Sequence, residues 1–600
     1  MLANKLISYY QKELGYLKIQ GKAFARHFPK VARRLGISEG MSEDPHIERL
    51  IESFALVTAQ IQQRLDEDMP EVTHALLNVL APQLLRPFPS VCIVQMSPDV
   101  KVSALTSGNL IEAKTYLFSR HGENQSCRFR TVYPVMIQPV SLTKAHLNLD
   151  EVTLCWNLNI KLTTWPGATL SANSLRVHLS GANNIVNILY TLLCSEVLSI
   201  HLQQDEQRYQ LSAQHICGIG FGENQNLLAG DSRISPTHSL LQDYFFFPQK
   251  FHFIDIPLPD GFVAGSKSEF TLKIAFNRCT IANQLEKMAA MVNENLFLLN
   301  CTPAINLFEH RAEPITPDHE IAEYLVIPDI RHQNAMEIWS VDSVSAMRKQ
   351  GNETLSRPIY PLFGLDHSAQ DGEPGLFWQC MHRETDSCEG SVPALFIAFS
   401  DRSEQPLTPG SDVVSLNLTC TNRELPSTMR NGDPDGDFES ELPIAGMKIT
   451  ALTRPTIPVR PPLKQAARWR LISQLSLNHM LIGGPEGVRV LKETLALYNF
   501  VDNPGIARLI NLLLRVESAP VVARLVPQDP QSLSRGIEIR ITFASEASTE
   551  AEYFLFCRFI DCFLALYAPV NSFTRVVTVI ESKEESQRVW PIRAGRLSWL

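Results

Sequence analysis

The chain has 600 residues, which at about 150 residues per domain predicts about four domains. Its 44% hydrophobic and 20% charged residues are an ordinary globular composition, which excludes a disordered or fibrous protein. The 54 Lys and Arg residues against 63 Asp and Glu residues give a net charge of −9. Because the chain has no overall cationic field, binding of nucleic acid or anionic lipid through bulk charge is disfavoured.

Cysteine usage and hydropathy predict the cellular compartment. The 12 cysteines are scattered singly among apolar residues, which is typical of reduced core residues in a cytosolic protein. The N-terminal residues lack the apolar core and cleavage site of a signal peptide. The most apolar long stretch, 553–570, contains Arg558 and Asp561, which favours a buried helix over a membrane span. We therefore expect a cytoplasmic protein that does not insert into the membrane.

The first 88 residues show helical periodicity with two apolar seams. A second helix is expected to begin at Asp44, as N-cap, and Pro45, and a third near residue 70, before the chain leaves in an extended proline-containing run at 86–90. The first seam consists of Tyr10, Leu14, Leu17, Gly21, Phe24 and Phe28, which alternate steps of four and three. The second seam consists of Ile47, Leu50, Phe54, Val57 and Ile61.

Charge is segregated between these seams. Residues 1–34 carry eight basic and one acidic side chain, which gives +7, whereas residues 35–71 carry two basic and nine acidic side chains, which gives −7. Opposite charges beside apolar seams favour pairing of the two helices. The pairing forms either a hairpin within one chain or a bundle between subunits, and the pattern leaves both open.

From Val91 onward the apolar period changes to two, which predicts strands interrupted by one helix at 183–196. Further strands at 395–399 and 413–421 indicate a second β domain. The proline-rich run 454–462 must be extended and is the best linker candidate. Beyond it we expect helices at 469–476, 487–498, 506–517 and 553–567 and strands at 537–543 and 573–580.

These patterns predict an α+β multidomain chain. Its expected parts are a helical, bundle-forming region at 1–88, a sandwich-like or barrel-like β-rich domain with a helical insertion at 89–320, a second β-rich domain that ends in the proline-rich linker at 321–460, and an α+β domain at 461–600.

Motifs that would carry catalysis or metal binding are incomplete. The run 218–222 has three glycines but no following lysine of a phosphate loop, and His319 with Glu320 lacks the second histidine of a zinc protease. Cys380, His382 and Cys388 lack a second ligand pair. The acidic loop 431–441 resembles a calcium loop without its final glutamate, so we expect a solvated loop, with a weak cation site as the alternative. We expect no cofactor, and no motif anchors catalysis, although a dispersed triad that comes together only in the fold stays open.

Six aromatic side chains lie between residues 244 and 253, more than one face of a strand can bury. We expect an internal strand covered on both faces, with a surface for a partner protein as the alternative.

Short motifs along almost the whole chain resemble, in order and spacing, the TssF (VasA or ImpG) family of type VI secretion baseplate subunits. These motifs are YYxxEL (9–14), FPKVARRLG (28–36), DPHIERL (44–50), LRPFPS (85–90), YFFFPQKF (244–251), NCTPAINLF (300–308), LTCTNR (418–423) and WRLISQLSLNH (469–479).

The resemblance implies a structural subunit, similar to the wedge proteins of contractile phage baseplates, on whose platform the tail tube and sheath polymerise. It implies TssG, TssK, TssE, the VgrG spike and a second copy of the chain as partners, and an indirect link to the inner-membrane complex. The rival hypotheses are a hydrolase with a dispersed site and a carbohydrate-binding β-sandwich. As partner interface we expect Tyr9, Tyr10, Leu14, Leu17, Phe24, Phe28, Ile47, Leu50, Phe54, Val57 and Ile61.

Overall fold

The computed structural model groups the chain into two compact units, one formed by 1–80 with 462–476 and the other by 81–461 with 477–600. The residues that the structure describes are 10, 14, 30, 37–38, 41–42, 46, 49, 52–60, 77, 84–100, 102, 105–120, 126–211, 216–228, 236–277, 282–318, 321–332, 335–350, 353–362, 376–387, 390–400, 413–441, 446–460, 487–500, 503–525, 532–566, 568, 572–581 and 583–595. Most of them belong to the larger unit.

The larger unit contains a closed barrel with the strand order β19-β3-β28-β27-β5-β6. Alternate side chains of its first strand, among them Val94 and Met96, are buried with Phe129 and Phe438, as in a small barrel filled by side chains. Its strands are β3 Val91–Pro98, β5 Tyr116–Ser119, β6 Arg128–Thr131, β19 Cys301–Ile305, β27 Phe438–Glu439 and β28 Met447–Ala451.

Two antiparallel sheets are inserted between the barrel strands β6 and β19, with the orders β13-β12-β17-β9-β8 and β14-β15-β11-β18. In β9 the alternation buries Leu158, Ile160 and Leu162 on one face, as the period of two predicts. The first sheet consists of β8 Val140–Leu149, β9 Trp156–Thr164, β12 Val197–Gln204, β13 Gln207–Leu211 and β17 Glu269–Phe276. The second consists of β11 Ser174–Leu179, β14 Cys217–Gly218, β15 Phe253–Pro257 and β18 Phe297–Leu299.

Helix α5, Asn183–Ser195, confirms the helix predicted at 183–196. Its buried residues Val186, Leu189 and Leu193 form one face, which explains why the helical period was readable. Other short elements here are β4 Asn109–Ile111, β7 Val135–Ile137, β10 Leu170–Ser171, β16 Val263–Ala264, α7 Ala282–Ala289, η3 Glu223–Gln225 and η5 Glu294–Leu296. The smaller unit has the two-stranded pair β1 Ile37–Ser38 and β2 Met41–Ser42.

A seven-stranded sheet has the order β20-β26-β22-β23-β24-β25-β21. Its core includes Val344, Ile397, Leu416 and Leu418, which confirms the strands predicted at 395–399 and 413–421. Its strands are β20 Phe308–Arg311, β21 Glu323–Leu325, β22 Glu337–Gln350, β23 Glu353–Pro361, β24 Phe377–Ser387, β25 Gly390–Ser400 and β26 Val413–Thr421, and the short helix α8 Leu425–Thr428 follows them.

The C-terminal domain is α+β, as predicted. Its sheet has the order β29-β30-β31-β32, with β33 paired to β31. The parallel pair β30 and β31 is joined through helix α13, the connection that parallel strands require. Its elements are α11 Gly487–Tyr498, α12 Pro504–Asn511, β29 Leu513–Arg524, β30 Leu533–Phe543, η7 Ser545–Thr549, α13 Tyr553–Ala565, β31 Phe573–Ile580, β32 Lys583–Val589 and β33 Arg593–Ala594.

The helix predicted at 506–517 is partly wrong, because α12 ends at Asn511 and β29 begins at Leu513. Val516 pairs with Ile541 in the register between β29 and β30. A short apolar run does not distinguish helix from strand, and here pairing across the sheet decides the conformation.

The strand predicted across the aromatic run is also wrong. Helix α6, Pro236–Phe246, and the 3₁₀ turn η4, Pro248–Phe251, hold these residues, and a strand, β15, begins only at Phe253. The expected burial is nevertheless found, since Tyr244 and Phe251 are at most 1% exposed. As a helix followed by a turn, the run points its aromatic side chains in several directions, and they are buried there.

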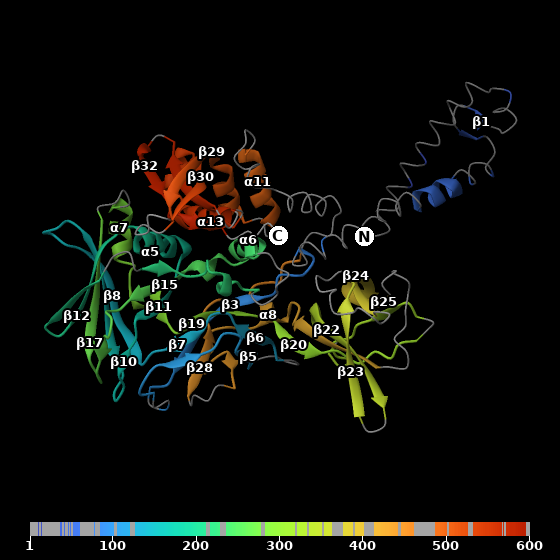
Figure 1. The fold of residues 1–600 in the computed structure, drawn as a ribbon, viewed down its shortest axis with the longest axis horizontal. Coiled ribbons are helices and arrows are strands. Elements are labelled where there is room, and N and C mark those ends of the chain that lie inside the picture. The colour runs from blue at the N-terminus through green and yellow to red at the C-terminus, as the bar shows by residue number, and fades with distance from the viewer. Residues whose placement is uncertain are drawn as a thin grey trace. The chain divides into compact units, whose positions relative to one another are not determined.

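Helix α13 packs on α6 and α5, and so joins the C-terminal domain to the rest of the larger unit (Figure 1). The rings of Tyr244 and Phe559 stack with centroids 4.1 Å apart. An ion pair between Arg588 and Glu196, 2.8 Å long, also crosses this contact between the C-terminal domain and the rest of the larger unit, the C-terminal joint.

A fully buried ion pair lies under the same joint. Lys250 Nζ donates to Asp243 Oδ2, and both side chains have no exposed surface. Asp243 Oδ2 also accepts a 3.2 Å hydrogen bond from the backbone N–H of Leu227. Burial raises the pKa of Asp243 and lowers that of Lys250, while their mutual attraction opposes both shifts.

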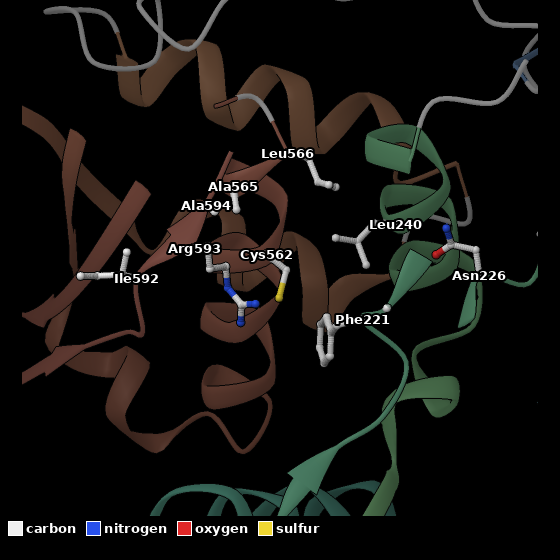
Figure 2. Close-up of a pocket in the computed structure, with 10 residues that line it drawn as sticks. Phe221, Asn226, Leu240, Cys562, Ala565, Leu566, Ile592, Arg593 and Ala594 are labelled. Atoms are coloured by element: carbon white, nitrogen blue, oxygen red, sulfur yellow. The ribbon is translucent and has the colours of Figure 1, made fainter. Parts of the chain in front are cut away.

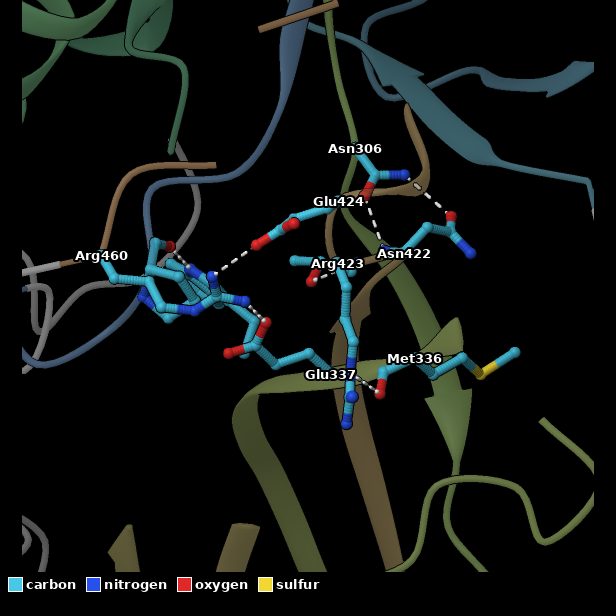
Figure 3. A network of polar contacts seen from close by, with 10 residues as sticks. Asn306, Met336, Glu337, Asn422, Arg423, Glu424 and Arg460 are labelled. Atoms are coloured by element: carbon cyan, nitrogen blue, oxygen red, sulfur yellow. Dashed lines mark hydrogen bonds and ion pairs between the residues drawn. The ribbon is translucent and has the colours of Figure 1, made fainter. Parts of the chain in front are cut away.

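The proline-rich run 454–460 is held against the larger unit by several contacts. Phe88 and Val459 form an antiparallel bridge. Figure 3 shows the neighbouring network, in which Arg460 binds Glu337 at 2.9 Å and Glu424 at 3.2 Å. Backbone hydrogen bonds from Thr456 N–H to Val91 O and from Val459 N–H to Phe88 O hold the run beside the residues that begin the first barrel strand.

The side chains of two histidines are buried near the aromatic run. His178, in β11, is 3% exposed, and His252, after η4, is 5% exposed. Burial, with a smaller contribution from His252, lowers the pKa of His178 to about 3, and burial lowers the pKa of His252 to about 4. Both are neutral at pH 7.

The buried ion pair predicts a strong coupling between its two residues. Lys250→Met leaves the Asp243 carboxylate buried and unpaired, so we expect a loss of about 3–5 kcal/mol in unfolding free energy. Asp243→Asn with Lys250→Met should recover part of this loss, because no charge remains while an acceptor for Leu227 N–H does. Urea unfolding measures both, and Lys273→Met, an exposed lysine of β17, should change stability by less than about 0.5 kcal/mol. A double variant no more stable than Lys250→Met would contradict the coupling.

The buried histidines predict that acid destabilises the protein. Since their folded pKa lies below the unfolded value of about 6.5, the unfolded state binds more protons below that pH, and each histidine should cost about 1–2 kcal/mol by pH 5. His178→Phe should therefore lose about 1 kcal/mol less than the natural protein between pH 7 and pH 5, measured by urea unfolding. His146→Gln, at an exposed histidine of β8, is the control. Equal pH dependence in His178→Phe and the natural protein would refute this assignment.

Candidate functional site

The predicted partner interface lies in the smaller unit, of which few residues are described. Tyr10 and Leu14 are helical and half-buried. Phe54 and Val57 belong to a helix described over 52–60 and are 59% and 51% exposed. The remaining predicted interface residues, Tyr9, Leu17, Phe24, Phe28, Ile47, Leu50 and Ile61, lie outside the described residues.

The helix at 52–60 has two unlike faces. The small side chains of Ala55 and Ala59, four residues apart, are fully buried, whereas Phe54, Leu56 and Val57 expose 42–59% of their surface. Residues three apart lie on neighbouring positions of a helix, so Phe54 and Val57 form one accessible apolar stripe. The face of this helix that carries the alanines is therefore buried, whereas the side chains of Phe54 and Val57 are exposed and could contact a partner.

The sequence elements that resembled chemical sites have structural roles or are undescribed. Gly220, with φ of +111°, turns the backbone over Phe251, where a Cβ would come within 2.9 Å of that ring. In the acidic loop, the Asp437 carboxylate accepts hydrogen bonds from the backbone N–H groups of Gly432, Asp433 and Ala451. This carboxylate thus holds the loop together.

Two of the candidate metal ligands from the sequence lie on one strand of the seven-stranded sheet. Cys380 and His382 lie on β24, and His319, Glu320 and Cys388 are outside the described residues. Among the described residues there is no group of three or more potential metal ligands. Within the same stretches, no helix is both long and apolar enough to cross a bilayer.

A cavity of about 250 Å³ lies where the C-terminal domain meets the loop 219–226 and α6 (Figure 2). Arg593 and Cys562 face it from the C-terminal side, and Phe221 and Leu240 from the opposite side. Its remaining lining residues are Gly222, Asn226, Ala565, Leu566, Ile592 and Ala594.

One arginine of the cavity lining, Arg593, and one residue of the opposite side, Phe221, contact further charged residues that do not line the cavity. Arg593 Nε donates to Asp561 Oδ2 at 2.6 Å, and Asp561 has no exposed surface. The guanidinium of Arg558 lies 5.0 Å from the ring centroid of Phe221. In the sequence, Arg558 and Asp561 indicate only that the apolar stretch 553–570 is not a membrane span. Their spacing of three in an otherwise apolar helix was the available signal, since it places both charges on one side of that helix.

Comparison with known proteins gives consistent matches. The family model described as "Type VI secretion system, TssF" matches residues 2–597. A Pseudomonas aeruginosa protein, "Type VI secretion system component TssF1", is 30% identical over 621 residues, which cover 98% of this chain and 99% of that protein.

Two solved structures are similar in fold. A chain of a type VI secretion TssK-TssF-TssG baseplate subcomplex matches with a TM-score of 0.73 and 24% identity, covering 91% of this chain and 98% of that one. A chain of a type VI secretion baseplate complex matches with a TM-score of 0.58 and 20% identity, covering 99% and 100%. The α+β architecture predicted from the sequence is thereby confirmed. With the family model matched from residue 2 to residue 597, this chain belongs to the TssF family of type VI secretion system proteins.

Proposed function

We propose that this chain is a structural, non-enzymatic component of a type VI secretion baseplate, on which tail tube and sheath polymerise. The observation that carries the proposal is the match to the TssF family over residues 2–597. The two solved structures of similar fold come from complexes named as baseplates, which supports the same role.

The proposed partners follow from these likenesses. TssK and TssG appear in the name of one of the similar complexes, which supports them as neighbours of this chain. TssE, the VgrG spike and a second copy of the chain are added by the motif resemblance alone. The same resemblance supports a cytoplasmic chain that is linked to the inner membrane through the assembled complex.

The proposed partner interface is the helical seam of residues 1–88. The exposed stripe of Phe54 and Val57 supports a bundle between chains, because a hairpin within one chain would cover these side chains. The charges of +7 at 1–34 and −7 at 35–71 would set which helices pair.

The experiment that tests the function is mass analysis of the native complex purified through a tag on this chain. We expect TssG and TssK in fixed ratio to the chain. A chain that is recovered alone, in cells where its deletion leaves contractile injection intact, would overturn the proposal.

The exposed stripe predicts the effect of two substitutions. Phe54→Asp with Val57→Asp should weaken binding to TssG by about 2–4 kcal/mol, because two apolar side chains can no longer be buried in the bundle. Quantitative co-purification measures the loss. Since both positions are exposed in the free chain, its urea unfolding should shift by less than about 0.5 kcal/mol.

Val522→Asp is the matched control for these substitutions. Val522 lies on β29 and is 57% exposed, close to the 51% of Val57. We expect TssG to bind this variant as it binds the natural chain. Unchanged binding by the Phe54 and Val57 double variant would remove these residues from the interface.

A further inference from the structure

The charges of Arg593, which lines the cavity, and of its neighbours Arg558 and Asp561 do not balance. Arg558 donates to neutral oxygens, the hydroxyl of Tyr190 at 3.1 Å and the backbone carbonyl of Gly218 at 3.2 Å. Arg593 donates to the carboxylate of Asp561, which is the one acidic group of this cluster. Guanidinium groups stay protonated in proteins, so two cations face one carboxylate, and the local net charge is at least +1 whether or not Asp561 is ionised.

The neighbouring groups that could become anionic do not offset this charge. Burial raises the pKa of the Cys562 thiol to about 11 and the pKa of the Tyr190 hydroxyl well above its usual value. Both groups are therefore neutral at pH 7. The nearby Arg588 already has its own carboxylate, that of Glu196, at 2.8 Å.

Arg593 has donors to spare on the cavity side. Within the part of the chain that the structure describes, its hydrogen bond goes from Nε to Asp561, which leaves Nη1 and Nη2 without a partner. Asp561 does not line the cavity, whereas Arg593 does. An anion in the cavity would therefore meet the guanidinium before the buried carboxylate. The side chain of Arg593 is 34% exposed, which makes the site reachable from solvent.

We propose that this cavity binds a carboxylate group on a short aliphatic stem. The terminal nitrogens of Arg593 would hold the two carboxylate oxygens in the side-by-side geometry that guanidinium groups favour. Phe221, Leu240 and Leu566 would cover the stem. A bound carboxylate would also neutralise the excess positive charge, which is costly in a partly buried site.

The size and surroundings of the cavity favour a side chain over a free ligand. A volume of about 250 Å³ is below the range of roughly 300–1,000 Å³ of sites for drug-sized molecules. It suits one glutamate or aspartate side chain carried by another protein. This source rests on the proposed baseplate function, whereas the carboxylate chemistry itself does not.

The chemistry is tested on the full chain with butyrate and butyramide, which share a shape and differ in charge. By calorimetric titration we expect butyrate to bind at least about ten-fold more tightly than butyramide. Arg593→Gln should abolish the preference. Arg515→Gln, which removes an exposed arginine elsewhere in the C-terminal domain, should keep it.

A second variant tests the site without depending on correct folding of Arg593→Gln. Ala594→Phe places a ring at the lining position next to Arg593 and leaves every charge in place. Ala594 is exposed, so the chain should fold normally. We expect butyrate binding to fall at least about ten-fold in this variant. Equal binding of butyrate and butyramide by the natural chain, or undiminished butyrate binding by Ala594→Phe, overturns the site.

The source is tested separately by co-purification of TssG and TssK with Ala594→Phe. A loss of either partner, with the Phe54 and Val57 seam intact, supports a carboxylate carried by that partner. Full recovery of both overturns the protein source, and butyrate binding by the natural chain then assigns the site to a free carboxylate. Loss of butyrate preference leaves the baseplate proposal standing, because family membership and the helical seam do not depend on this cavity.

Discussion

The larger unit depends on closure of the barrel by strands that are far apart in the chain. Strand β3 pairs with β19 on one edge and with β28 on the other, and Val91 N–H reaches Thr456 Oγ1 across 365 residues. Closing so long a loop costs conformational entropy, which grows only slowly with loop length. The buried barrel core, with Val94, Met96 and Phe438, offsets that cost once the ring is complete. Everything between these strands is consequently an insertion into a closed frame.

This closure explains how far the sequence could predict the fold. Elements with a strong local period were predicted well, such as the helix at 183–196, because its buried leucines repeat on one face. The division into four parts remains a prediction. No local sequence pattern indicates that Phe438 and Ile449 complete a barrel whose first strand begins at Val91. The aromatic run was assigned the wrong conformation because the composition of Tyr244 to Phe253 reports burial and not backbone geometry.

The candidate sites differ in how much of them a sequence can reveal. Phe54 and Val57 form a stripe within one helix, so their spacing alone predicts that they act together. The exposure of these two residues is a tertiary property, because it depends on Ala55 and Ala59 being the buried side. The cavity combines Phe221, Leu240 and Arg593 from distant segments, and Arg558 lies next to it against the ring of Phe221. Only folding brings such groups together, so pattern reasoning could at most notice two charges in an apolar helix.

The two buried charge clusters at the C-terminal joint show opposite solutions to one problem. Lys250 and Asp243 are fully enclosed and match one to one, so neither needs a ligand. Arg593 pairs with the Asp561 carboxylate, whereas Arg558 donates to neutral oxygens, so this cluster has one excess positive charge beside the cavity that Arg593 lines. A protein interior tolerates unbalanced charge only where solvent or a counter-charge can reach it. One arginine paired with one carboxylate would suffice to stabilise the joint. The cluster of Arg558, Arg593 and Asp561 stabilises it fully only when an anion from outside neutralises the excess positive charge.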